Sequence, residues 1–257
     1  MKDNLLDIRS LTLQIVGKSL CKNLDLAISH NQHWGLLGKN GVGKTSLLHC
    51  LMGLREIDAG SILLHGKPMS ELSRRELATE IGILFQENIH TLPSTVLETV
   101  LLGRHPHVQS MLRDDPRDLQ KAQQALQEFD LADMAGRYID SLSGGEKQRL
   151  ALAMLVVQSP KLFLLDEPSN HLDIAYQISM LDLLKKKIDE QEASFIMATH
   201  DINLAARYCD RIILLMGDGN YLSGSKQTIL NEKNLSTAYN CEIQSVAIQD
   251  RTLFFPA

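Results

Sequence analysis

Aromatic residues, cysteines and long apolar runs are all scarce in this chain. Only 5% of its 257 residues are Phe, Trp or Tyr, and four are Cys. The cysteines are widely spaced and form no Cys-x-x-Cys pair, which argues against a disulfide framework and favours reduced thiols in a cytosolic compartment. The longest apolar run, Leu150 to Val157, is too short for a membrane helix of about 18 residues or more. The charged start of the sequence also predicts no secretory leader.

An excess of positive charge is missing as well. The chain has 26 Lys and Arg against 31 Asp and Glu, which gives a formal net charge of −5. This balance provides no footprint for a nucleic-acid backbone, so we predict no nucleic-acid partner. With 44% hydrophobic residues, the chain can bury a core for one large α/β domain or for a core with a smaller lobe.

Short apolar runs alternate with helical patterns, which predicts an α/β fold with a mainly parallel sheet. The expected strands span residues 34–37, 81–85, 162–165, 195–198 and 212–216. Four of them are followed directly by Gly38, Gln86, Asp166 and the pair Thr199-His200. Ligands of parallel sheets bind beyond the carboxyl ends of strands, so chemistry is expected there.

Residues 93–157 lack a comparable strand pattern and predict a smaller, mostly helical lobe. Within it, Leu119, Ala122, Leu126 and Phe129 repeat at helical spacing. A further amphipathic helix is expected from Ile174 to about Ile188. Its three lysines at 185–187 are interpreted as a solvated face rather than a surface for anionic partners.

The sequence GKNGVGKT, from Gly38 to Thr45, matches the phosphate-binding pattern GxxxxGK[ST] and follows an expected strand. Its glycines allow backbone N–H groups to surround phosphate oxygens, and the helix that follows directs its positive end toward them. Lys44 is predicted to reach the β- and γ-phosphates, and the Thr45 hydroxyl to bind Mg²⁺. The pattern therefore predicts a nucleotide triphosphate site.

Two adjacent carboxylates end the apolar run KLFLLDEP at residues 161–168. Asp166 is predicted to hold Mg²⁺, and Glu167 to accept a proton from the attacking water. The pair is a weak signal alone, because many strands end in solvated carboxylates. Together with the phosphate-binding loop it indicates a nucleotide hydrolase.

The segment LSGGE, residues 142–146, precedes KQRLALAML and selects one class of such hydrolases. Ser143 and Glu146 are spaced as a capping box at the start of a helix. LSGGE also resembles the signature motif of ATP-binding-cassette ATPases, and the other ordered motifs of that family are at 38–45, 86, 166–167, 170–173 and 200. The resemblance covers nearly the whole chain.

This resemblance implies roles for further residues. Gln86 would sense Mg²⁺ and the attacking water, Asp173 would lie across a dimer interface, and His200 would contact the γ-phosphate and orient Glu167. Catalysis is assigned to Lys44, Gln86, Glu167 and His200, and Mg²⁺ binding to Thr45, Gln86 and Asp166. Nucleotide contacts are assigned to Gly38, Asn40, Gly41, Gly43, Lys44, Thr45, Ser46, Ser143, Gly144, Gly145, Glu146 and Asp173.

One position departs from the family. An aromatic residue usually stacks on adenine after the first strand, whereas this chain has Ile15, Val16 and Gly17 there. Aliphatic contact with adenine is expected instead.

The resemblance implies a RecA-like P-loop core with N-terminal antiparallel strands and an inserted helical lobe. We expect one ABC ATPase domain over residues 1–257, with its core at 1–92 and 158–230. The helical signature lobe is expected at 93–157, and a short C-terminal extension at 231–257.

The segments 97–107 and 199–211 look like the subgroup that serves importers of iron-siderophores, haem and cobalamin. Membership implies an ATPase that dimerises on ATP and Mg²⁺, docks on separate permease subunits at the cytoplasmic face of the inner membrane, and works indirectly with a substrate-binding protein. Leu92, Val96, Leu101 and Leu102 are either a docking surface or lobe core. Two alternatives remain: a soluble family member in iron-sulfur assembly, and a non-transport clamp.

Overall fold

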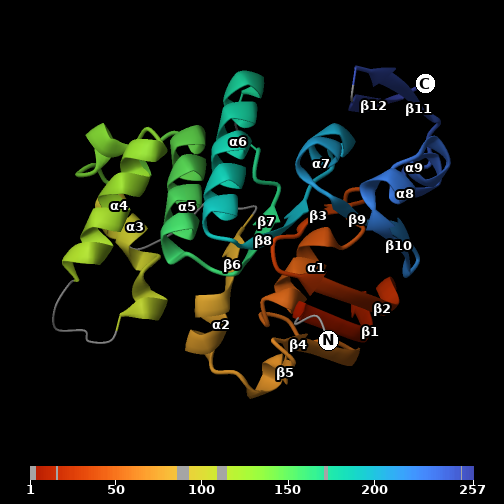
Figure 1. Ribbon diagram of the computed structural model, residues 1–257, viewed down its shortest axis with the longest axis horizontal. Helices are drawn as coiled ribbons and strands as arrows, with labels where there is room; N and C mark the ends of the chain where they lie inside the picture. The colour runs from red at the N-terminus through yellow and green to blue at the C-terminus, as the bar shows by residue number, and fades with distance from the viewer. Residues whose placement is uncertain (1–3, 16, 86–92, 109–114, 171–172, 250) are drawn as a thin grey trace. The chain divides into compact units, whose positions relative to one another are not determined.

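The computed structural model describes residues 4–15, 17–85, 93–108, 115–170, 173–249 and 251–257. The chain forms two compact units (Figure 1). The first comprises residues 1–72, 164–167 and 194–257, and the second comprises residues 73–163 and 168–193. The second unit contains more residues than the helical lobe that the resemblance implies, at 93–157. Those limits therefore stay a prediction.

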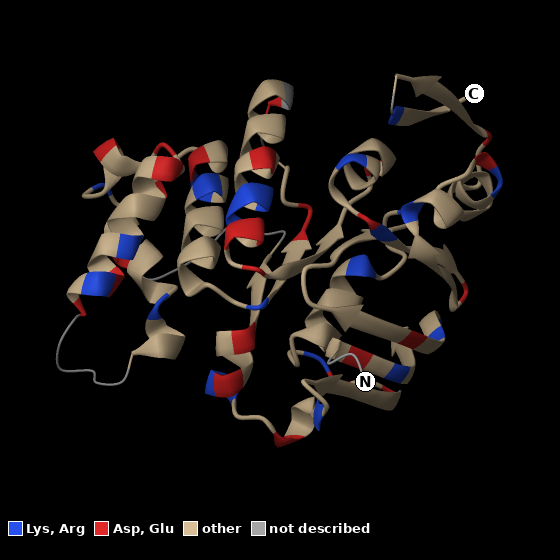
Figure 2. Cartoon of the chain, in the orientation of Figure 1, with Lys and Arg blue, Asp and Glu red and all other residues tan. Residues whose placement is uncertain are grey.

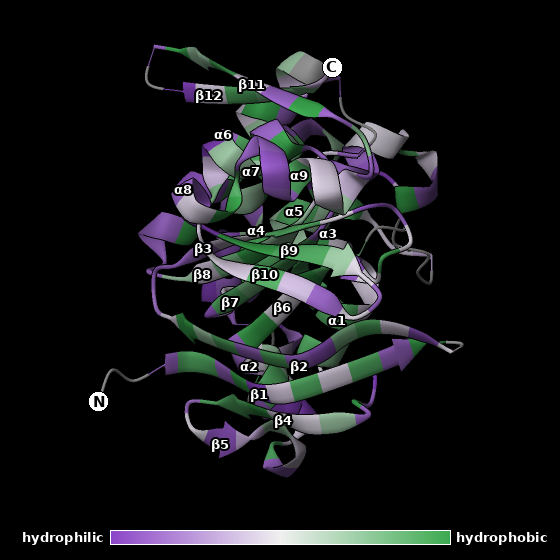
Figure 3. Cartoon of the chain, turned by 90° about the vertical axis from the view of Figure 1, so that its right-hand side faces the viewer, coloured by the Kyte–Doolittle hydropathy of each residue, from purple (hydrophilic) through white to green (hydrophobic). Residues whose placement is uncertain are grey.

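The first unit contains an antiparallel sheet of order β2-β1-β4-β5. Its strands are β1 (Asn4–Ile15), β2 (Lys18–Ser29), β4 (Ala59–Leu64) and β5 (Lys67–Pro68). Figure 3 shows apolar and polar residues alternating along β1 and β2, which is the pattern of strands that bury one face. This sheet matches the N-terminal antiparallel strands expected from the resemblance.

A larger, mainly parallel sheet runs in the order β10-β9-β3-β8-β7 through the first unit. Its strands are β3 (His33–Leu37), β7 (Leu162–Asp166), β8 (Ser194–Ala198), β9 (Arg211–Gly217) and β10 (Asn220–Ser225), and β3 pairs in parallel with both β8 and β9. All residues of β3, β7 and β8 are buried, which explains their continuous apolar sequences. The predicted strands at 34–37, 162–165, 195–198 and 212–216 are confirmed as β3, β7, β8 and β9, and the fifth, at 81–85, is confirmed as β6 (Ile81–Leu84).

Helices and a hairpin complete the first unit. They are α1 (Lys44–Leu51), the 3-10 turn η1 (Met69–Glu71), α7 (Ile202–Tyr208), α8 (Lys226–Ile229), α9 (Glu232–Tyr239) and the hairpin β11 (Ile243–Ile248) with β12 (Arg251–Pro256). Gly35 lets α7 approach β3, because a Cβ at this position would lie 2.9 Å from Ile212 Cδ1 and 3.2 Å from Ala205 Cβ.

The second unit is mostly helical, and among its described residues β6 (Ile81–Leu84) is the one strand that lies wholly within it. Its helices are α2 (Arg74–Glu80), α3 (Val96–Leu102), α4 (Pro116–Glu128), α5 (Gly144–Gln158) and α6 (Ile174–Glu190), with 3-10 turns η2 (His105–His107), η3 (Ala132–Met134) and η4 (Ile139–Ser141). In its described part no helix is long and apolar enough to cross a membrane, and the same holds for the described first unit.

The lysine run on α6 is not uniformly solvated. Figure 2 shows acidic and basic residues sharing this helix. Lys187 is only 14% exposed and its Nζ lies 2.7 Å from Glu128 Oε1, whereas Lys185 pairs with Asp189 at 2.6 Å. The prediction of a wet face is therefore wrong for Lys187, because that side chain joins α6 to α4.

Candidate functional site

The phosphate-binding loop follows β3 and depends on three glycines with positive φ: Gly38 at 147°, Gly41 at 74° and Gly43 at 107°. A Cβ at Gly38 would lie 2.8 Å from the Leu215 carbonyl oxygen, and one at Gly43 would collide with Leu20. Helix α1 begins directly after Gly43 without a side-chain cap. Its first N–H groups are therefore available to an anion.

Lys44 is folded back over the loop that precedes it. Its Nζ donates hydrogen bonds to Gly38 O at 3.0 Å and Lys39 O at 3.4 Å, and its side chain is 7% exposed. Burial lowers its pKa, against the opposing charges of Glu167 and Asp166. A phosphate would replace carbonyl dipoles with a full negative charge, so this buried cation is poised for an anionic ligand.

Asp166 ends β7 and is 2% exposed. Neither carboxylate oxygen has a hydrogen-bond partner among the described residues. Burial raises its pKa, opposed by the nearby Thr45 hydroxyl and by the charges of His49 and Lys44. A buried carboxylate without a partner and a neighbouring hydroxyl suit Mg²⁺, which binds oxygen atoms and often one or two protein carboxylates plus substrate phosphates. The described residues contain no cluster of three or more His, Cys, Asp or Glu that could hold a metal ion.

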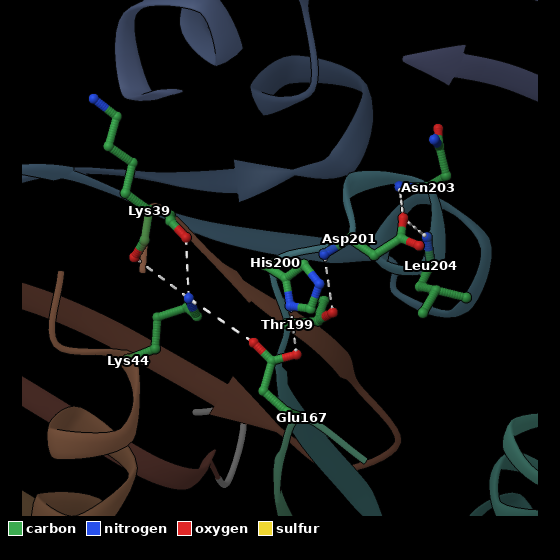
Figure 4. A network of polar contacts seen from close by, with 9 residues as sticks. Lys39, Lys44, Glu167, Thr199, His200, Asp201, Asn203 and Leu204 are labelled. Carbon is green, nitrogen blue, oxygen red and sulfur yellow. Dashed lines mark hydrogen bonds and ion pairs between the residues drawn. The ribbon is translucent and has the colours of Figure 1, made fainter. Parts of the chain in front are cut away.

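Glu167 follows in the left-handed backbone region, with φ of 50°. Its N–H donates to Ala198 O at 2.9 Å, and its Oε2 lies 2.9 Å from His200 Nδ1. The other oxygen, Oε1, lies 4.0 Å from Lys44 Nζ. An unfavourable backbone conformation thus aims a buried carboxylate between a cation and an imidazole (Figure 4).

Hydrogen bonds among the neighbouring residues stabilise the turn that contains His200. Asp201 N–H donates to Thr199 Oγ1 at 3.1 Å, and Asp201 Oδ1 accepts from Asn203 N and Leu204 N to cap α7. The His200 ring remains 59% exposed. The His200 ring therefore contacts the Glu167 carboxylate on one side and remains accessible to solvent elsewhere. This exposure leaves the ring free to contact a ligand bound at the phosphate-binding loop.

The structure brings Gly38, Lys44, Asp166, Glu167 and His200 together in the first unit. Of the other predicted loop residues, Asn40 and Gly41 are exposed, Thr45 and Ser46 half-buried. Gln86, Leu92 and Val16 lie outside the described residues.

The signature residues belong to the second unit. Ser143 and Glu146 form the predicted capping box of α5, with hydrogen bonds of 2.6 and 3.3 Å between their side chains and backbone N–H groups. The hydrogen bond from Ser143 N–H lowers the pKa of Glu146. Gly144 and Gly145 form the first turn, and exposed Asp173 caps α6 by accepting from Tyr176 N at 2.9 Å.

Three residues in or next to the phosphate-binding loop were not found by sequence reasoning: Lys39, Tyr239 and Asn240. Lys39 occupies a variable position of the motif, and the other two lie in a tail without any motif. With the Asn240 amide oriented to satisfy both of its ends, its oxygen accepts from Lys39 Nζ at 3.0 Å. No pattern in the sequence signals this contact.

Comparisons with known proteins find similarity over most of the chain. The ABC transporter family model matches residues 21–170. The chain is 34% identical over 245 residues to the hemin import ATP-binding protein HmuV of Escherichia coli O157:H7, covering 93% of both chains. It is 33% identical to the achromobactin transport ATP-binding protein CbrD of Dickeya dadantii strain 3937, covering 93% of this chain and 88% of that one. A solved inward-facing structure of a putative metal-chelate type ABC transporter contains a chain with a TM-score of 0.84 and 27% identity, covering 99% of this chain and 98% of that one.

Proposed function

The chain belongs to the ABC transporter family, as one of its ATP-binding proteins that hydrolyse ATP, and on that premise we propose that it powers uptake of an iron-siderophore, haem or cobalamin-type substrate. The observation that carries the proposal is similarity over nearly the full chain to ATP-binding proteins of hemin and achromobactin transport. In this function, the protein acts at the cytoplasmic face of the membrane, bound to separate permease subunits.

Hydrolysis depends on the arrangement around the phosphate-binding loop. Lys44 and the first N–H groups of α1 bind the β- and γ-phosphates, while Glu167 accepts a proton from the attacking water. His200 holds Glu167 by the 2.9 Å contact and meets the γ-phosphate with its exposed edge. Asp166 and Thr45 would hold Mg²⁺. When bound, the ion neutralises phosphate charge.

One chain carries one phosphate-binding loop and one LSGGE segment, so we assign the complete site to two copies. The N-terminus of α5 has two glycines after its Ser143 cap, so its N–H groups can approach a phosphate closely. In the dimer, this helix end meets the γ-phosphate held by the loop of the other copy. Asp173 then lies at the interface.

The permease is proposed to dock near α3. Within the suggested surface, Leu102 is 53% exposed and Leu101 is half-buried, whereas Val96 is fully buried. Val96 therefore belongs to the core of the second unit, and we no longer include it in the proposed docking surface. Leu102 is the residue from which an introduced cysteine should reach a permease.

The substrate class is tested in the source cell. We would delete the gene and return either the wild-type chain or Glu167→Gln, then follow uptake of radiolabelled ferric siderophore, haemin and cobalamin separately. Loss of one uptake in the deletion, restored by the wild type and not by Glu167→Gln, would support the proposal. If all three uptakes are unaffected by the deletion, while the purified chain hydrolyses ATP, the substrate assignment is wrong and the ATPase assignment remains.

A further inference from the structure

The C-terminal extension, residues 231–257, reaches the phosphate-binding loop through the end of α9. Asn240 terminates this helix in the left-handed conformation, with φ 52° and ψ 37°. Its amide donates to Thr237 O at 3.3 Å, and its oxygen accepts from Lys39 Nζ at 3.0 Å. Figure 4 shows the Lys39 side chain turned away from Lys44. The second residue of the loop is thus tied to the extension.

Tyr239 approaches the first residue of the same loop. Its phenol oxygen is inaccessible to solvent and has no hydrogen-bond partner within the described part of the chain. Burial raises the pKa of Tyr239 to about 12; the Gly38 backbone acts in the opposite direction, and the charges of Glu167 and Asp201 add to the increase. An unpaired buried hydroxyl costs stability, so its position beside Gly38 calls for a functional reason.

Gly38 and Lys39 are also the residues that hold the loop lysine. Their carbonyl oxygens accept the two hydrogen bonds of Lys44 Nζ, at 3.0 and 3.4 Å. The loop contains glycines at positive φ, which have large conformational freedom when nothing restrains them. Restraint of Gly38 and Lys39 from outside therefore reduces the entropy lost when the loop closes around phosphates.

The extension is anchored at its other end beside His200. Asn203 in α7 exchanges two hydrogen bonds with the backbone of Phe254 in β12, at 2.9 and 3.0 Å. Within the extension, Glu232 Oε1 accepts from both N and Oγ of Ser245 at 2.8 Å. One folded segment therefore contacts both the phosphate-binding loop and the helix that follows His200.

We propose that Tyr239 and Asn240 are positioning residues for ATP binding, which restrain Gly38 and Lys39 and thereby set the conformation in which the loop and Lys44 receive the phosphates. The Gly38 backbone already lies next to the Tyr239 hydroxyl, and nucleotide binding shortens this contact into a full hydrogen bond. The inference rests on the ATPase function proposed above, and it assigns to the extension a role in substrate affinity.

The test compares Tyr239→Phe with wild type in the full chain, by titration with a fluorescent ATP analogue and by thermal unfolding without nucleotide. Loss of one hydrogen bond at the site is expected to weaken binding about 3- to 10-fold. The Tm without nucleotide should stay the same or rise, because the removed hydroxyl has no partner in that state. A hydroxyl with a merely structural role would instead lower Tm and leave affinity unchanged.

Tyr221→Phe is the matched control. The Tyr221 hydroxyl donates to Asn23 O at 3.0 Å and accepts from Asp25 N at 3.1 Å, in the same unit but with no contact to the loop. This variant should lower Tm and leave the affinity unchanged. Equal affinities of Tyr239→Phe and wild type would overturn the role of Tyr239. Absence of binding by the wild type would instead count against the ATPase function.

Asn240 is tested separately by Asn240→Gly, which keeps the left-handed helix end without strain and removes only the amide. We expect KM for ATP to rise about 3-fold with little change in kcat, and Asn240→Asp to restore it because a carboxylate oxygen also accepts from Lys39. In the double variant Lys39→Ala/Asn240→Gly, KM for ATP should rise no further than in the more affected single variant, because both changes remove the same contact. Additive losses, or no rescue by Asp, would refute the Lys39 contact as the cause.

Discussion

Glu167 Oε2 and His200 Nδ1 lie 2.9 Å apart, although the Glu167 side chain is only 7% exposed and the His200 side chain is 59% exposed. The carboxylate therefore has a fixed direction, set by a ring that solvent and ligand can reach. This pair separates two tasks: proton acceptance by the buried group and contact with the ligand by the exposed one.

Glu167→Gln should stop hydrolysis and preserve nucleotide binding. The amide keeps the shape of the side chain but cannot accept the water proton, so the rate of phosphate release is expected to fall about 10²- to 10⁴-fold. ATP then stays bound and the closed dimer accumulates, which light scattering with ATP and Mg²⁺ would detect. Glu71→Gln, at an exposed site, should keep the wild-type rate. Wild-type turnover in Glu167→Gln would remove this residue from the mechanism.

His200→Ala should lower kcat more than it changes KM for ATP, because Glu167 loses its only hydrogen-bonded side-chain partner in the described residues. The expected loss in kcat is about 10²- to 10³-fold, comparable to removing one transition-state contact. Since the two residues act as a pair, the double variant Glu167→Gln/His200→Ala should be little slower than Glu167→Gln alone. A fully multiplicative loss would show that His200 acts independently of Glu167.

Much of the fold was predictable because its strands are short, buried and parallel. Runs such as 162–165 and 195–198 are apolar throughout, which a strand covered on both faces requires. The residues at the ends of these strands, among them Gly38, Asp166 and the pair Thr199-His200, then indicated from topology where chemistry was to be expected. The capping box at Ser143 was predictable for a local reason, since both partners lie within one helical turn.

The C-terminal extension was not predictable in the same way. Strands β11 and β12 pair with each other, and Val246 and Phe255 are exposed. Because these strands are not covered on both faces, their sequences are not apolar throughout, which is the pattern that revealed the buried strands. The contact between Asn240 and Lys39 joins residues about 200 positions apart, and no local pattern encodes it. The resemblance implied which residues would contact nucleotide, and it gave no indication of the neighbouring residues that we propose restrain the loop.

Asp166→Asn should stabilise the nucleotide-free protein while impairing hydrolysis. Burial raises the pKa of Asp166 in the folded state, so folding favours the protonated form. The stability from this group is fully present below the unfolded pKa and is lost as pH rises through the raised folded pKa. The wild-type chain therefore loses this stability as the pH rises and the Asn variant does not, so the Tm advantage of the variant should grow with increasing pH.

The same variant should lose about 10²- to 10³-fold in Mg²⁺-dependent hydrolysis, as one electrostatic contact disappears. Thermal unfolding across the acid range and phosphate release at neutral pH are the two measurements. A variant that is less stable than wild type at neutral pH would show that the carboxylate is satisfied in the folded state, against the geometry.

Lys44→Ala should weaken ATP binding about 10- to 100-fold, because hydrogen bonds from a charged donor are lost where phosphate oxygens would accept them. Titration with a fluorescent ATP analogue measures the change. Lys67→Ala, which removes an exposed lysine of the same unit, should bind as the wild type does. Unchanged affinity in Lys44→Ala would place the phosphates elsewhere.

Ser143→Ala separates the two roles of the signature serine when it is compared with Ser73→Ala. Both serines cap helices of the second unit through the same Ser-x-x-Glu box, so each change should cost about 0.5–2 kcal/mol of unfolding free energy. Only Ser143 is assigned to the nucleotide of the second copy. In a Glu167→Gln background, ATP should therefore drive dimerisation of the Ser73→Ala chain and fail to do so with Ser143→Ala, as measured by light scattering. If both variants lose the same stability and both still dimerise, Ser143 is a helix cap alone and the shared site must be abandoned.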